Sequence, residues 1–182
     1  MAVIEAIETV YLEADTASVT FASLGSYEHL QLRFSIRSTY VTTNHYESIY
    51  LRFATGGGAI DTGTNYSIGQ MYGTGAGGTG AGAAITQTGI YVAGLADTLA
   101  ADYSAGYGQS VLDIFDYRNP NKNTTISTLN STASHTGGTT FVVFASGLWD
   151  NTGAVDKVQL IPYSGSDFVR GSEFTLYGLN SS

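Results

Sequence analysis

Every second residue from Leu30 to Ile36 is apolar, and the residues between them are polar or charged. A period of two places alternate side chains on opposite faces of a β-strand, so this segment predicts a strand with one buried face. It lies within a strand-patterned block from Ala17 to Ser38, and a second such block runs from Phe141 to Leu179. Both ends of the chain are therefore expected to belong to one core built from β-sheet.

Further strand patterns follow along the chain, separated by turn signals such as the asparagines on either side of Pro120. Roughly ten strands at this spacing predict an all-β fold: a single-domain antiparallel β-sandwich, jelly-roll-like in topology. At most one short helix is expected, over residues 95–103, and the glycine-rich segment 73–84 is expected to be a mobile loop. We expect residues 1–15 to form an extended N-terminal arm and residues 16–182 to form the sandwich domain.

Composition narrows the classes of function. The chain has 182 residues and no cysteine, which excludes disulfides and thiolate metal ligands. Seven Lys and Arg residues against fifteen Asp and Glu residues give a net charge of −8, so nucleic-acid binding is not expected. No apolar run approaches the roughly 20 residues that cross a bilayer, so no membrane partner is expected. The absence of cysteine favours assembly in a reducing cytoplasm. The first residues lack the basic leader and apolar core of a secretory signal, so no such signal is expected there.

Two patterns that suggest a cofactor or a metal are better explained structurally. Residues Gly75–Gly80 match G-x-G-x-x-G, but more glycine follows where the phosphate-binding motif needs a helix N-terminus. The three histidines, His29, His45 and His135, lie far apart without the spacing of metal ligands, so they are predicted to be structural. No cofactor and no metal are expected.

Charged residues on the predicted strands form the main candidate cluster. Asp113 and Asp116 lie three apart, so their side chains should point to opposite faces, and they cannot act alone as an acid–base pair. Arg33, Arg37 and Arg52 lie on the polar faces of two successive strands. If those strands pair, the guanidinium groups could meet the two aspartates in a charge-assisted network. A structural or subunit-interface cluster is the favoured interpretation, ligand binding is the alternative, and no enzymatic activity is expected.

Aromatic residues are the second candidate for a functional contact. The chain has thirteen tyrosines and one tryptophan, Trp149. Such side chains stack on sugar rings when exposed, and they are also enriched in protein interfaces. Trp149 is therefore a candidate aromatic contact, with both interpretations open.

Short motifs along the chain resemble those of a known group of proteins. In order, they are SVTFASLGSYEHLQLRFSIRS, YLRFATG, NYSIGQMYGTG, VLDIFDYRNPNKNTTI, SGLW and SEFTLYGL. This series resembles small virion structural proteins of tailed bacteriophages, and the resemblance covers nearly the whole chain from Ala17 to Leu179. It departs from the group at residues 73–83, where relatives usually have a short Asn/Ser-rich turn.

The resemblance implies a capsid decoration (cement) protein that binds the major capsid protein on the outer capsid surface and stabilises the shell. It further implies a homotrimer located in the virion and assembled in the cytoplasm of the bacterial host. The alternative implied by the same group is a tail-fibre or tail-tip module that binds host surface carbohydrate.

Overall fold

The computed structural model describes residues 3–40, 46–96, 106–132 and 140–180. Within these residues the chain forms no helix and has no helical segment that could span a membrane. The described residues form twelve strands: β1 (Val3–Tyr11), β2 (Val19–Phe21), β3 (His29–Ile36), β4 (Tyr46–Thr55), β5 (Tyr66–Thr74), β6 (Thr79–Gln87), β7 (Ile90–Ala96), β8 (Gly108–Phe115), β9 (Thr124–Thr132), β10 (Phe141–Trp149), β11 (Val155–Pro162) and β12 (Glu173–Asn180).

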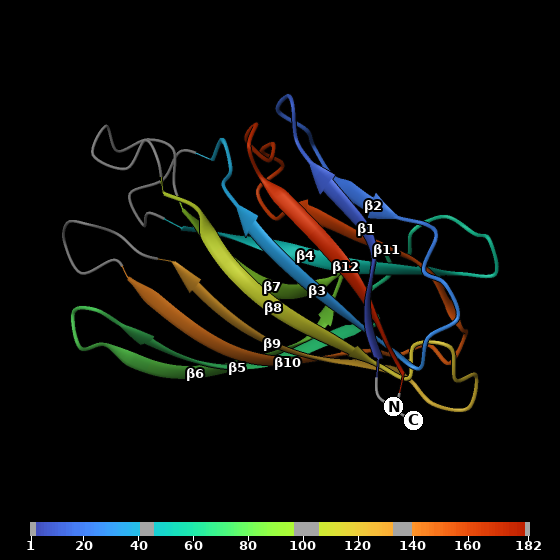
Figure 1. Cartoon of the computed structure of the whole chain (residues 1–182). Coiled ribbons are helices and arrows are strands. Elements are labelled where there is room, and N and C mark those ends of the chain that lie inside the picture. The colour runs from blue at the N-terminus through green and yellow to red at the C-terminus, as the bar shows by residue number, and fades with distance from the viewer. Residues whose placement is uncertain (1–2, 41–45, 97–105, 133–139, 181–182) are drawn as a thin grey trace.

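The strands form two sheets that pack face to face (Figure 1). The large sheet has eight strands in the order β1-β12-β3-β8-β9-β10-β5-β6, and the small sheet has four in the order β2-β11-β4-β7. The neighbouring strands pair antiparallel throughout. The expected all-β antiparallel sandwich is confirmed, while its jelly-roll topology stays a prediction.

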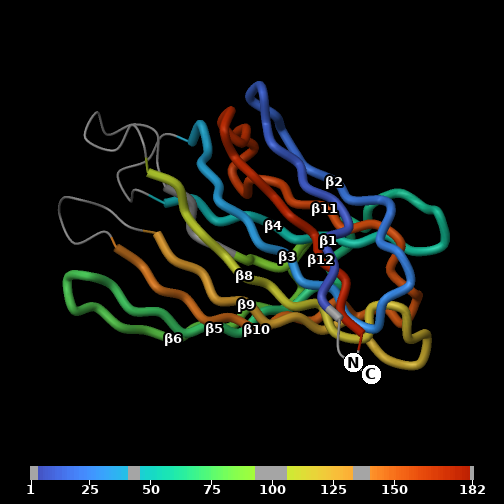
Figure 2. The backbone as a smooth tube through the Cα atoms, viewed as in Figure 1, coloured from blue at the N-terminus to red at the C-terminus, as the bar shows by residue number. Residues whose placement is uncertain are grey.

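The two strand-patterned blocks meet in the large sheet, as expected. Strand β3 lies between β12 and β8 (Figure 2). Phe34 is opposite Phe174 on β12, and Leu32 is opposite Leu176. All four apolar residues of the alternating segment are buried, and they face the small sheet in a core shared with Phe53 and Leu160. The period of two in the sequence thus corresponds to one face in the core and one face turned outward.

The glycine-rich segment is a β-hairpin, and its prediction as a mobile loop was wrong. Strand β5 continues to Thr74, a tight turn follows, and β6 returns from Thr79 beside β5. Gly80 lies directly opposite Tyr72, and a Cβ at Gly80 would come within 2.6 Å of the tyrosine ring. Glycine at this position therefore leaves space for an aromatic side chain on the neighbouring strand.

The helix expected over residues 95–103 is described only at its start. Residues 95–96 end strand β7, and the remainder of the expected helix lies outside the described residues.

The N-terminal segment belongs to the large sheet. Residues 3–11 are extended, and they pair with β12 from Val3 opposite Asn180 to Tyr11 opposite Glu173. The segment expected to be an arm thus lies within the large sheet as its edge strand, and the proposed boundary at residue 15 stays a prediction.

Candidate functional site

One continuous row of side chains crosses the face of the large sheet that points away from the small sheet. This face is called the outer face. The strand registers align the row across all eight strands. In order from β1 to β6, its members are Thr9, Thr175, Arg33, Val111, Leu129, Phe144, Met71 and Ala81. Directly opposed residues in antiparallel strands have side chains on the same face, so these residues form a line of neighbours.

The middle of this row is apolar and exposed. Val111 is 39% exposed, Leu129 55%, Phe144 50% and Met71 60%, and Val142 extends the patch beside Phe144 on β10. These five residues are called the apolar strip. Scattered apolar residues are common on protein surfaces, but a contiguous apolar patch marks an interaction surface. No described helix covers this face (Figure 1).

The outer face is hollowed next to the apolar strip. A hollow of about 590 Å³ has Arg33, Glu173 and Tyr177 on one side and Val111 and Leu129 on the other. A second hollow of about 550 Å³ is lined by Met71, Val142 and Phe144 together with residues of the β5–β6 hairpin. The face thus combines a polar, charged half with an apolar half.

Arg33 is held in the charged half by neighbours on its own sheet. Its guanidinium lies over the Tyr177 ring, 5.2 Å from the centroid, and its Nε donates to Gln31 Oε1 at 2.9 Å. Gln31 Nε2 in turn donates to Asp113 Oδ1 at 2.8 Å. Arg33 and Asp113 are therefore connected through a glutamine.

The structure does not assemble the predicted arginine cluster, because β3 and β4 do not pair. Arg52 belongs to the small sheet, where its Nε donates to the Thr88 carbonyl at 2.7 Å and its guanidinium lies over Tyr50. Arg37 is almost completely buried just after β3, and its backbone N–H donates to Ser172 Oγ. Arg33 lies in a network that includes one of the predicted aspartates, Asp113.

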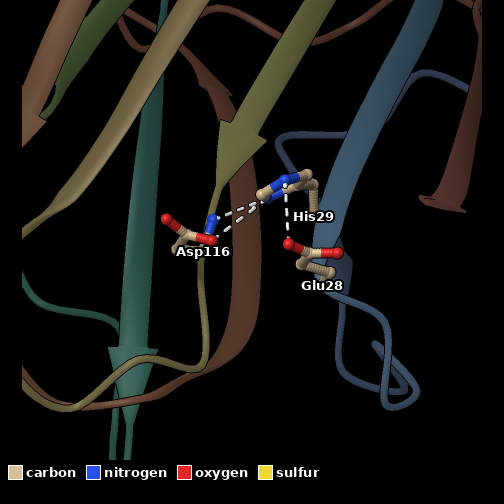
Figure 3. Close-up of side chains that lie close together, drawn as sticks. All are labelled: Glu28, His29 and Asp116. Atoms are coloured by element: carbon tan, nitrogen blue, oxygen red, sulfur yellow. Dashed lines mark hydrogen bonds and ion pairs between the residues drawn. The ribbon is translucent and has the colours of Figure 1, made fainter. Parts of the chain in front are cut away.

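Asp116 joins a different group at the end of β8 (Figure 3). Its backbone N–H donates to His29 Nδ1 at 3.0 Å, and its carboxylate forms an ion pair with Lys122. Glu28 lies on the other side of the imidazole, with Oε1 3.7 Å from Nε2. Asp116 has a positive φ of 47°, a conformation that aspartate tolerates better than most residues, and these contacts hold it there.

Glu28, His29 and Asp116 are close enough to hold a metal ion together, because their ligand atoms lie within 4.8 Å of one another. Two features of the group disfavour a metal. Nδ1 of His29 already accepts a backbone hydrogen bond, and the Lys122 ammonium neutralises the Asp116 carboxylate. The arrangement fits a structural ion network that ties β3 to the β8–β9 turn. His45 and His135 lie outside the described residues.

Trp149 is not an exposed aromatic contact, so that candidate role was wrong. Its side chain is 0% exposed and stacks on Tyr66, with ring centroids 6.1 Å apart and planes 15° apart. Its indole Nε1 donates to Asp61 Oδ2 at 2.8 Å. A buried indole N–H needs such a partner, so Trp149 is a core residue with a polar anchor.

Asp61 anchors the loop between β4 and β5. It accepts hydrogen bonds from Trp149 Nε1, from Asn65 Nδ2 at 2.9 Å and from the Gly63 backbone N–H at 2.8 Å. Burial alone would raise the pKa of this carboxyl, but the three hydrogen bonds to its charged form outweigh burial and lower the pKa. The ionised form of Asp61 therefore stabilises the folded state.

This lowered pKa predicts a specific loss of stability in acid. The contribution of Asp61 is complete above the ordinary aspartate pKa of about 3.9, and it is lost as the pH falls through the lower folded-state pKa. Asp61→Asn should lower the free energy of unfolding by about 1 kcal/mol at pH 7, because it replaces charge-assisted hydrogen bonds with neutral ones. Denaturant unfolding across this pH range should show the difference between wild type and variant shrinking in acid. A difference that stays constant down to pH 2 would contradict this role.

A third hollow is lined by residues of β4 and β7 in the small sheet and of β5, β6, β9 and β10 in the large sheet. It measures about 560 Å³, and its aromatic lining consists of Tyr46, Tyr72, Tyr91 and Phe141. The rings of Tyr46 and Phe141 are in contact, with centroids 4.6 Å apart. The described residues that line this hollow carry no charge, and its polar groups are amides and hydroxyls, including Gln70 and Asn130.

Comparisons with known proteins give only weak similarities. No protein-family model matches the sequence, and no curated protein matches it. The exoplasmic/lumenal domain of VIP36 matches in its Ca²⁺-bound form, with 10% identity, a TM-score of 0.32 and coverage of 100% of this chain and 84% of that one. Its Ca²⁺/Man3GlcNAc-bound form has a TM-score of 0.29, at 10% identity, with coverage of 100% and 85%. A fructofuranosidase from Schwanniomyces occidentalis, complexed with fructosylnystose, matches at 8% identity and a TM-score of 0.27, over 98% of this chain and 34% of that one. At these scores the similarities establish neither a common fold nor a common function.

Proposed function

We propose that this protein is a non-enzymatic structural protein of a tailed-bacteriophage virion, which decorates the capsid by binding the major capsid protein through its outer face. The outer face is proposed as the binding surface because it carries the apolar strip. There, five large apolar side chains lie together on a sheet face that no described helix covers. The assignment to a virion is supported by the series of short sequence motifs between Ala17 and Leu179 that resembles phage structural proteins. The same resemblance supports a homotrimer on the capsid surface.

The chemistry of the outer face suits a protein partner. The strip residues are about half exposed, so completing the burial of each contributes about 1 kcal/mol. Arg33 and Glu173 at the rim of the first hollow can fix the orientation of a partner through polar contacts. An apolar centre with a polar rim is the usual arrangement of a specific protein interface.

A decoration protein stabilises a shell because it binds the assembled lattice and not the dispersed subunits. Particles of the phage that encodes this chain should therefore rupture at a lower temperature when they lack the protein, and adding the purified protein back should restore the wild-type value. Thermal release of packaged DNA, followed with a DNA-binding dye, measures this directly. Equal rupture temperatures with and without the protein would remove the decoration role.

The aromatic hollow supports a second candidate function, that of a tail-fibre or tail-tip module binding host surface carbohydrate. Tyrosine faces together with neutral amides and hydroxyls suit the apolar faces and hydroxyl groups of a sugar. Polysaccharide purified from the host envelope should then bind the wild-type protein in calorimetry, and Tyr72→Ala should weaken binding at least about tenfold. If no heat of binding is detected with wild type, this alternative fails.

A further inference from the structure

We propose that strand β6 is an interface between copies of this chain, in which β6 of one copy pairs antiparallel with β6 of a second copy. Strand β6 is the last strand of the large sheet, at the opposite edge from β1 (Figures 1 and 2). An edge strand presents backbone N–H and C=O groups that have no partner within the sheet, and an extended strand is the structure that satisfies them. The proposal concerns the isolated protein and does not depend on binding to a capsid.

The other three edges of the sandwich are protected against such pairing. Strand β1 carries Glu5 and Glu8, and its register shifts at a bulge between Ala6 and Glu8. Strand β2 is only three residues long. Strand β7 is interrupted by a bulge, where its register with β4 shifts between Ser48 and Tyr50. Charges, bulges, short strands and cover are the devices by which proteins prevent edge-to-edge association.

Strand β6 has none of these devices along most of its length. Its sequence, TGAGAAITQ, contains no charge and no proline, and its register with β5 is regular from Thr79 to Ala84. The regular part ends at Thr86, a non-glycine residue with a φ of 55°. Six consecutive residues with small side chains therefore leave a flat edge that a second strand can approach.

A second copy is the partner that the charge distribution favours. Each copy has a net charge of −8, so two copies repel one another over most of their surfaces. The sequence from Thr62 to Ala96, which contains the whole β5–β6 hairpin, has no charged residue. Contact through this hairpin therefore brings two copies together where their repulsion is weakest.

Antiparallel self-pairing has a defined geometry. Identical edges that pair antiparallel are related by a two-fold axis perpendicular to the sheet, which keeps both outer faces on the same side. If Ala81 lies opposite Ala81 of the second copy, Met71 and its equivalent continue the apolar strip across the contact. This contact is distinct from the three-fold contact of the proposed trimer, because the trimer is proposed for protein on the capsid surface and the β6 contact for the free protein.

Pairing of two copies through β6 is tested by introducing charge on that strand. Ala81→Lys combined with Ala83→Lys places two ammonium groups on β6, both at exposed positions. Sedimentation over a range of protein concentrations should show reversible dimers for wild type, and the double variant should raise the dissociation constant at least about tenfold through like-charge repulsion. The matched control is Ile4→Lys combined with Ala6→Lys, two exposed residues of the opposite edge strand β1, and this protein should associate like wild type. Wild type that stays monomeric throughout, or a double variant that dimerises like wild type, would overturn the proposal.

A disulfide cross-link between two copies tests whether β6 is the strand at their contact. The native chain has no cysteine, so Ala81→Cys introduces the only thiol. Opposed residues in an antiparallel pair have Cα atoms about 4.5–5.5 Å apart, within the range that a disulfide can bridge. Mild oxidation should give covalent dimers of Ala81→Cys but not of Ala6→Cys. Dimers that sediment together yet do not cross-link at Ala81 or, in a separate variant, at Ala83 would place the contact elsewhere.

Discussion

Replacing Trp149 with alanine is expected to lower the free energy of unfolding by about 3–5 kcal/mol, which is the usual cost of truncating a fully buried aromatic side chain. The indole is completely buried, it packs against Phe53 and Tyr66, and it donates to Asp61. Its removal leaves a cavity in the core and takes one donor from the loop anchor. Thermal denaturation should show a fall in Tm of about 10 °C or more.

Trp149→Phe separates the contribution of ring packing from that of the hydrogen bond to Asp61. Phenylalanine retains most of the apolar packing but has no N–H, so it should cost clearly less than alanine, about 1–2 kcal/mol. If the alanine variant unfolded like wild type, Trp149 would not be a core residue. If the phenylalanine variant lost as much stability as the alanine variant, the hydrogen bond to Asp61 and not the packing would be the larger contribution.

Introducing charge into the apolar strip is expected to abolish partner binding without harming the fold. Leu129→Lys combined with Phe144→Lys replaces two opposed, half-exposed side chains at the centre of the strip. Buried, unpaired ammonium groups at an interface centre are strongly unfavourable, so binding to capsids that lack the protein should weaken at least about 100-fold. Co-sedimentation of purified protein with such capsids measures this.

The control for that variant has the same charge change on another surface. Ala22→Lys combined with Ser23→Lys adds two charges at exposed positions just after β2 in the small sheet. This protein should bind capsids like wild type, and both variants should unfold at denaturant concentrations close to that of wild type. Normal capsid binding by the apolar-strip variant would exclude the outer face as the binding surface.

The fold was predictable where the pattern is local. The alternation from Leu30 to Ile36 predicts a half-buried strand, and β3 has that burial pattern. The prediction of a mobile loop over residues 73–84 was wrong because glycine usually indicates flexibility, whereas here Gly80 provides space beside Tyr72. Only the pairing of β5 with β6 reveals that requirement.

The candidate site was predictable only in part, because it depends on long-range register. The apolar strip takes its residues from four strands, and a shift of one residue in any pairing would turn its side chains inward. Similarly, Trp149 finds its acceptor 88 residues away, and His29 accepts from a residue 87 positions distant. Local periodicity contains no information about which distant residues meet.

The proposed decoration role is tested by a density map of intact particles of the phage proposed to encode this chain, at a resolution that orients the sandwich. Copies are expected over the capsid shell, with Leu129 and Phe144 of the apolar strip facing the major capsid protein. Copies confined to the tail, or copies on the shell whose apolar strip faces solvent, would contradict it.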